Sequence, residues 1–138
     1  MKYILDSCIA LKWVLPEGDS DVALRLRDAF RSAAYELLAP EIFPVEIAHA
    51  LTRAERQGRI PISSSGRRLA DALTNCPLLF PSSPLLARAV ELSSQARIGV
   101  YDCLYVALAE REGCALVTAD DRLVRTFPGG SVIPLSAL

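Results

Sequence analysis

The sequence predicts an α/β fold in which helices cover a mostly parallel sheet of four to five strands. Short apolar runs alternate with longer segments whose apolar residues recur at helical spacing. Strands that are joined through helices run parallel and are covered on both faces. A chain of 138 residues with 51% hydrophobic side chains can build a core without disulfides. We therefore expect residues 1–138 to form a single domain.

The strands are expected where a short apolar run stops at a charged or turn-forming residue. These runs are residues 3–5, 36–39, 115–118 and 131–133, with a further short apolar run at 78–80. Capping residues mark the helices between them. The helices are expected to begin near Ser20, Pro44, Ser63, Pro84 and Tyr101. Gly58 and Gly113 end the second and the last of these helices, and the helix after Pro84 has Leu86, Ala89 and Val90 on its apolar side.

Composition and charge exclude several classes of protein. Fifteen basic and sixteen acidic residues give a net charge of −1, which is unlike the high net charge of a disordered segment. Charged or turn-forming residues interrupt every apolar run well before the roughly 18 residues that a membrane helix needs. Four scattered cysteines and one histidine do not offer a zinc cluster. We expect a soluble, cytoplasmic protein that does not contact membranes.

Four carboxylates stand out because they do not lie in polar, solvent-facing runs. Asp6 and Asp120 each follow a predicted strand, so the two should project from the same edge of a parallel sheet. Glu46 and Asp102 are lone charges in the first turns of otherwise apolar helices. Stabilisation of a helix amino terminus is the simplest explanation for these two. It does not explain why they are embedded in hydrophobic sequence.

Convergence of these four carboxylates would require a cation. Two carboxylates about 5 Å apart repel each other by about 3 kcal/mol at an effective dielectric of about 20. A site made only of oxygen ligands favours a hard divalent ion, Mg²⁺ or Mn²⁺. Such an ion can activate a water molecule and offset the charge of a phosphate, which suits hydrolysis of a phosphodiester bond.

Four segments of the chain resemble the successive motifs of the PIN-domain ribonucleases, and in particular the VapC-type toxins of toxin–antitoxin pairs. The segments are DSCIALKW at 6–13, PVEI at 44–47, YDCLYVALA at 101–109 and VTAD at 117–120. The resemblance spans residues 2 to about 133. It implies a PIN-like three-layer α/β/α sandwich and an endoribonuclease that depends on Mg²⁺ or Mn²⁺. It also implies a toxin that forms a homodimer and is inhibited by a small cognate antitoxin.

The resemblance further assigns roles to individual residues. The acidic quartet that binds metal and catalyses RNA cleavage would be Asp6, Glu46, Asp102 and Asp120. Ser7 and Thr118 would be polar neighbours that orient ligands or water. The Thr-x-Asp spacing favours Asp120 over the adjacent Asp121, which is expected to begin the next helical turn.

Two positions depart from the family pattern. His49 stands where the family often has asparagine, and Cys103 stands where it usually has alanine. His49 shares a helix face with Glu46 and Arg53, so it would either contact substrate phosphate, steady Glu46, or simply be solvated. A Cys8–His49 hydrolase pair is conceivable, but no residue supplies the third, orienting group.

Arginines and aromatic residues are the candidates for contact with RNA. The candidate arginines, any of which would also serve as a solubilising surface residue, are Arg53, Arg59, Arg67, Arg68, Arg97 and Arg122. Trp13 and Tyr101 would either stack on a base or pack in the core or an interface.

The same residues bear on three other functions. A non-catalytic PIN-like scaffold that binds protein or RNA remains the alternative, and metal binding would discriminate against it. A receiver domain requires a pair of acids at the first strand and a late lysine, which this chain lacks. A haloacid-dehalogenase-type phosphatase requires Asp-x-Asp, whereas Ser7 and Cys8 follow Asp6 here.

Overall fold

A five-stranded parallel sheet forms the centre of the protein, which is described over residues 1–138 by a computed structural model. The strand order is β3-β2-β1-β4-β5, and all four pairings are parallel. The strands are β1 Lys2–Leu5, β2 Glu36–Pro40, β3 Leu78–Phe80, β4 Ala115–Thr118 and β5 Val132–Pro134. The predicted α/β class and parallel sheet are confirmed, and the apolar run at 78–80 supplies the fifth strand.

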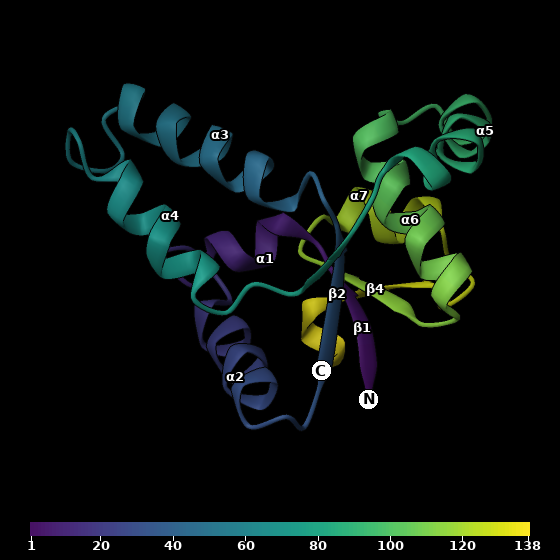
Figure 1. Ribbon diagram of the computed structural model, residues 1–138, viewed down its shortest axis with the longest axis horizontal. Coiled ribbons are helices and arrows are strands. Elements are labelled where there is room, and N and C mark those ends of the chain that lie inside the picture. Colours follow the sequence, from purple (N-terminus) through teal and green to yellow (C-terminus); the bar gives the residue numbers. More distant parts are fainter.

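Helices cover both faces of this sheet (Figure 1). They are α1 Ser7–Leu11, α2 Ser20–Arg31, α3 Phe43–Arg56, α4 Ser65–Leu73, α5 Leu86–Ala96, α6 Val100–Glu112 and α7 Asp121–Thr126, with short 3₁₀ turns η1 Ser83–Leu85 and η2 Leu135–Ala137. In Figure 1, α1–α4 lie to the left of the sheet and α5–α7 lie to its right. The chain steps outward from β1 to β3 and then crosses back to β4, so right-handed crossovers place the two groups on opposite faces.

The strand order reverses beside β1, which lies between β2 and β4. The register pairs Leu5 with Val117, and the backbone N–H of Asp6 donates to the carbonyl of Val117 at 3.1 Å. The ends of β1 and β4 are therefore hydrogen-bonded together. In open parallel sheets, ligands bind beyond the carboxyl ends of the strands at such a reversal.

One hydrophobic cluster of 33 buried residues joins the sheet to both helical layers. Helix α6 is its centre, because all seven residues from Cys103 to Ala109 are buried. It contacts β1, β2 and β4 as well as α5, so it has no polar face along this stretch. It ends at Gly113, whose φ of 64° is the left-handed conformation that glycine adopts most readily. No helix is both long enough and apolar enough to cross a membrane.

Two local features differ from the sequence-based expectations. Residues 7–11 form α1, although no helix is predicted there. On α5 the apolar side is displaced from the predicted one: Leu86 and Val90 are exposed, whereas Ala89 and Leu92 are buried. The predicted and the observed apolar sides both fit helical spacing, and packing of α5 against α6 determines which one is buried.

Leu108→Ala should lower the free energy of unfolding by about 2–5 kcal/mol, because Leu108 is fully buried and its truncation leaves a cavity in the core. Leu86→Ala is the matched control, since Leu86 is 43% exposed and loses little contact. Urea denaturation followed by circular dichroism measures both. Equal stability of the two variants would contradict the central place of α6 in the core.

Candidate active site

Asp6 lies immediately after β1 and is buried. The hydroxyl of Thr118, at the end of β4, donates to its Oδ2 at 2.7 Å. The backbone N–H of Cys8 donates to Oδ1 at 3.3 Å, so Asp6 also caps α1. The carboxylate is thus fixed from two sides, by the neighbouring strand and by the helix that follows it.

Glu46 is held from two other elements. It lies in the first turn of α3, and the hydroxyl of Tyr105 on α6 donates to its Oε1 at 2.6 Å. The Ser7 hydroxyl lies 3.3 Å from the same oxygen and 3.5 Å from Oδ1 of Asp6. Ser7 therefore lies between the two carboxylates, as expected of a residue that orients their oxygens.

Asp120 begins the connection from β4 to α7. Its own N–H donates to the Thr118 hydroxyl oxygen at 3.0 Å, so Thr118 links Asp120 to Asp6. Its Oδ1 accepts the N–H groups of Arg122 and Leu123 at 2.9 and 3.4 Å and caps α7. Asp121 is exposed and begins α7, as the Thr-x-Asp spacing indicates.

Asp102 approaches the same region from the first turn of α6. Its carboxylate lies 3.9 Å from the guanidinium of Arg122, a largely exposed side chain. This is the one ion pair that involves the acidic quartet, because Asp6, Glu46 and Asp120 have no basic side chain within 4.0 Å. Basic side chains of the protein therefore neutralise little of the quartet's charge.

The pKa shifts of these carboxyl groups show that they share one region. Burial raises the pKa of Asp6, Glu46 and Asp102 above the ordinary values. Repulsion adds to each rise in pKa, from Asp120 on Asp6, from Asp6 and Asp102 on Glu46, and from Asp6 and Asp120 on Asp102. Hydrogen bonds from Thr118 and Tyr105 oppose the rises in the pKa of Asp6 and of Glu46 respectively. The charges of Asp6, Glu46 and Asp102 are thus destabilised by burial and by neighbouring carboxylates of the quartet.

The chemistry of this cluster fits a hard divalent cation. Its donors are carboxylate oxygens with the Ser7 and Thr118 hydroxyls beside them, which is the ligand type that Mg²⁺ and Mn²⁺ prefer. No three acidic side chains stand in a geometry ready to coordinate one ion. Binding would therefore need side-chain adjustment, and the gain would be relief of the repulsion described above.

Comparison with known proteins matches residues 3–127 to the PIN domain. The chain belongs to the PIN domain family. It is 32% identical over 123 residues to VapC ribonuclease Mb0985 of Mycobacterium bovis, with 89% of each chain covered. Its fold is similar to that of PAE2754 from Pyrobaculum aerophilum, with a TM-score of 0.73 at 20% identity over 99% of this chain and 85% of that one. It is also similar to a chain in a toxin–antitoxin complex from Klebsiella pneumoniae, with a TM-score of 0.63 at 17% identity over 96% and 97% of the two chains.

In this PIN domain, Cys8 and His49 do not form a nucleophile–base pair. The Cys8 sulfur accepts the N–H of Ala119 at 3.4 Å and lies 3.7 Å from the hydroxyl oxygen of Thr118. Burial and the charge of Asp6 raise the pKa of the Cys8 thiol, which suppresses the reactive thiolate. His49 is exposed on α3, and Glu46 is steadied by hydroxyl groups rather than by the imidazole.

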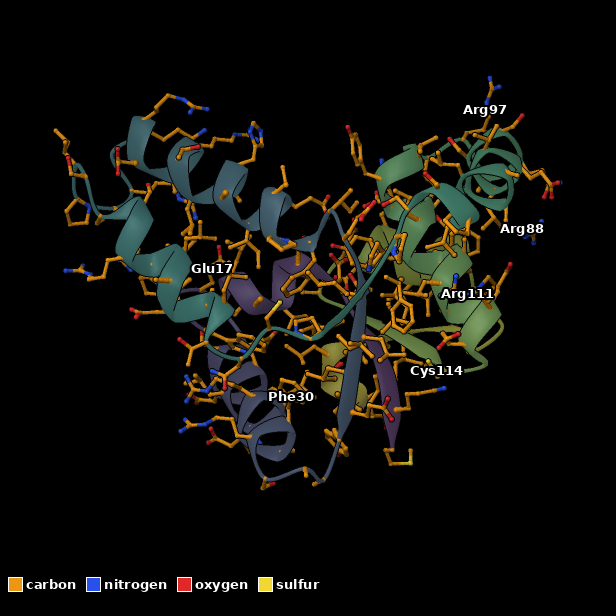
Figure 2. The ribbon with its side chains drawn as sticks, in the orientation of Figure 1. Glu17, Phe30, Arg88, Arg97, Arg111 and Cys114 are labelled. Carbon is orange, nitrogen blue, oxygen red and sulfur yellow. The ribbon has the colours of Figure 1, made fainter.

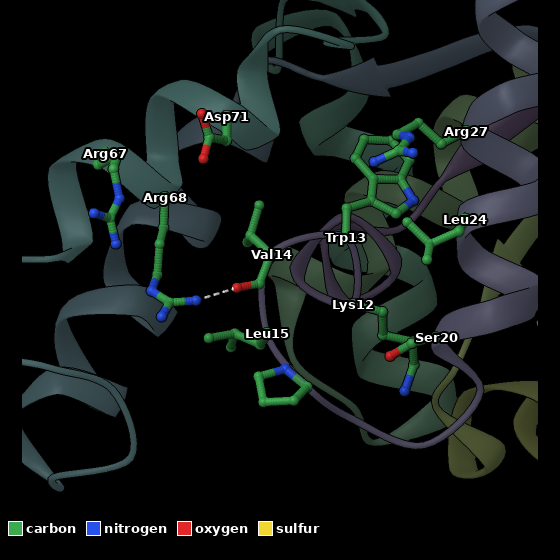
Figure 3. A pocket seen from close by; sticks show the side chains of 11 residues that line it. Lys12, Trp13, Val14, Leu15, Ser20, Leu24, Arg27, Arg67, Arg68 and Asp71 are labelled. Carbon is green, nitrogen blue, oxygen red and sulfur yellow. Dashed lines mark hydrogen bonds between the residues drawn. The ribbon is translucent and has the colours of Figure 1, made fainter.

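The candidate RNA-binding arginines are spread over the PIN domain. Only Arg122 contacts the acidic quartet. Arg97 lies at the end of α5 and points outward in Figure 2. Arg68 donates to the backbone carbonyl of Val14 at 2.5 Å, and with Arg67 it lines a separate pocket bordered by α2 and α4 (Figure 3). Arg53 is exposed on α3.

Tyr105 is the supporting residue that the sequence did not single out. It is buried, it donates the shortest hydrogen bond to Glu46, and burial followed by the charge of Glu46 raises the pKa of its phenol. The group therefore stays protonated and remains a donor. Its spacing of three residues from Asp102 is the available signal, since residues at i and i+3 share a helix face.

Thr118→Val should lower the free energy of unfolding by about 1–3 kcal/mol. The fully buried hydroxyl both donates to Asp6 and accepts from the Asp120 N–H, so its loss leaves two groups without their partner. Thr118→Ser is the control because it keeps the hydroxyl. Chemical denaturation should show a clearly smaller loss of unfolding free energy for Thr118→Ser than for Thr118→Val. Equal losses would contradict the role given to the Thr118 hydroxyl.

Asp102→Asn should raise the stability of the metal-free protein near pH 7. Because its folded-state pKa is raised, Asp102 binds its proton more tightly in the folded than in the unfolded chain. The unfolding free energy of the unaltered protein therefore falls as the pH rises from the ordinary value of 3.8 through the raised one. The Asp102→Asn protein does not lose stability in this way. The difference in unfolding free energy between the variant and the unaltered protein should therefore shrink as the pH approaches 4. Denaturation in EDTA across this range measures it, with the exposed Asp71→Asn as control. A destabilised Asp102→Asn protein at neutral pH would contradict the repulsion.

Proposed function

We propose that this PIN domain is an endoribonuclease that depends on Mg²⁺ or Mn²⁺ and hydrolyses phosphodiester bonds of RNA. The observation that carries the proposal is the convergence of four acidic side chains at the reversal of strand order, where burial and repulsion raise the pKa of Asp6, Glu46 and Asp102 and one exposed arginine is the only basic contact. The name of the Mycobacterium bovis relative, a VapC ribonuclease, supports the substrate class.

The proposed catalytic and metal-binding residues are Asp6, Glu46, Asp102 and Asp120. A bound divalent ion would offset the charge of the phosphate and make water a stronger nucleophile. Thr118 fixes the direction of the Asp6 carboxylate, and the Asp120 N–H is held by the same hydroxyl. Tyr105 and Ser7 both engage Oε1 of Glu46, which leaves Oε2 without a protein donor and free to accept a proton from water.

Toxin activity and its partners form the second part of the proposal. The structural neighbour from Klebsiella pneumoniae is a toxin–antitoxin complex, which supports a cognate antitoxin for this chain as well. We propose that residues 1–138 act as one PIN domain, since a single cluster of buried residues runs through them, and that the working form is a homodimer.

Asp6→Asn and Asp102→Asn should each reduce the rate of RNA cleavage by about 100-fold or more, because each removes a negative ligand from the ion. Cleavage of a 5′-labelled single-stranded RNA in Mg²⁺ or Mn²⁺ measures the rate. Asp71→Asn is a matched control, since Asp71 is exposed on α4.

Metal binding is measured separately from the rate of RNA cleavage. Mg²⁺ should raise the melting temperature of the unaltered protein, and the rise should be smaller for Asp102→Asn. Undiminished cleavage in excess EDTA would overturn the mechanism. RNA binding without cleavage and without a metal-dependent shift would favour the non-catalytic scaffold.

A further inference from the structure

A pocket of about 690 Å³ lies between α1 and α3, directly beside the acidic quartet. Its volume is within the range of about 300–1,000 Å³ that is common for small-ligand sites. Glu46, a member of the quartet, lines it together with Ser7, whose hydroxyl lies 3.3 Å from Oε1 of Glu46, so the pocket and the carboxylates are continuous. Tyr101, at the start of α6, forms part of its wall.

The walls of this pocket are mainly apolar and contain no lysine or arginine. Leu11, Ile42 and Ala50 supply aliphatic surface. Val45 and Tyr101 are 68% and 64% exposed, so both side chains are accessible to a ligand in the pocket.

The charge of the pocket excludes a phosphate as its occupant. Glu46 is its one acidic residue and would repel a phosphate, and no lysine or arginine lines the pocket to attract one. The second pocket, shown in Figure 3, differs in this respect because Lys12, Arg27 and Arg67 line it. The pocket beside Glu46 instead suits an uncharged, flat group that can stack on an aromatic ring.

We propose that the pocket between α1 and α3 receives the nucleobase next to the phosphate that is cleaved, with Tyr101 as its stacking surface. This inference rests on the proposed ribonuclease function and deepens it. An RNA strand whose phosphate lies at the quartet must place the adjoining base within a few ångströms of it. Unstacked bases of single-stranded RNA stack on tyrosine and histidine rings, and both ring types line this pocket. Tyr101, Val45 and His49 would then influence which base is accepted.

The first test measures cleavage of a short single-stranded RNA whose cut site has been mapped. Removing the base on one side of the cut, by placing an abasic nucleotide there, should lower kcat/KM about tenfold or more, the scale of losing one aromatic stacking contact. Tyr101→Ala should produce a similar loss on intact RNA and no further loss on the abasic RNA. Tyr101→Phe keeps the ring and should recover most of the activity.

A matched pair of valines controls for the general effect of removing exposed apolar surface. Val45→Ala shortens the pocket wall and should raise KM, whereas Val90→Ala removes a comparably exposed side chain on α5. The Val90→Ala protein should cleave like the unaltered chain.

The second test detects the base directly. 2-Aminopurine is placed at each position around the cut in turn, and its fluorescence is followed on binding to the Asp102→Asn protein in Mg²⁺, which leaves the RNA intact. Quenching should occur at the same position that is sensitive to base removal, and Tyr101→Ala in the same background should abolish it.

The outcomes separate the two proposals. Efficient cleavage that is indifferent to abasic positions and to Tyr101→Ala overturns the nucleobase pocket and leaves the ribonuclease proposal intact. Absence of cleavage by the unaltered chain overturns the ribonuclease proposal and the pocket assignment with it. Normal cleavage and quenching by Tyr101→Ala, together with weaker association with the antitoxin, would assign the pocket to a protein partner and also overturn the inference.

Discussion

The hydrogen bond from Thr118 to Asp6 joins the carboxyl ends of β1 and β4, which are 112 residues apart in the chain. It forms only because the two strands are parallel neighbours in register, with Leu5 beside Val117. The same hydroxyl oxygen accepts the N–H of Asp120. One buried side chain thereby links the Asp6 carboxylate to the backbone of Asp120, and the helices that carry Glu46 and Asp102 complete the cluster around it.

Such a cluster carries an electrostatic cost that the rest of the fold must offset. The raised pKa values of Asp6, Glu46 and Asp102 express that cost, since each charge is both partly buried and repelled by its neighbours. Burial of apolar side chains near the cluster offsets this electrostatic cost. Helix α6 brings Asp102 to the site from its first turn, and the residues that follow it are buried from Cys103 to Ala109. Helix α6 thus contributes a repelled charge and is also the helix with the most buried residues.

Two chemically different surfaces adjoin each other at this edge of the sheet. The carboxylates form a polar surface that suits a cation and the phosphate it attracts, whereas the pocket between α1 and α3 is largely apolar. Glu46 and Ser7 belong to both. A nucleotide has the same division, with a charged backbone and a flat, uncharged base. This correspondence connects the proposed reaction with the proposed site for the base.

The sequence by itself determined the strands, the parallel arrangement and the gathering of the four carboxylates. Asp6 and Asp120 follow apolar runs, and the ends of parallel strands necessarily meet at one edge. Glu46 and Asp102 are recognisable in the sequence as single charges in apolar helices, and the motifs in which the four acidic residues lie resemble those of the PIN family.

Only the tertiary structure decided how those carboxylates are held. The short helix α1, the position of Ser7 between Asp6 and Glu46, and the hydrogen bond from Tyr105 all depend on contacts between elements distant in the chain. The choice between two possible apolar sides of α5 was likewise made by α6. Local spacing specifies which residues share a face of an element, but the neighbour that each face meets is fixed only when the layers pack together.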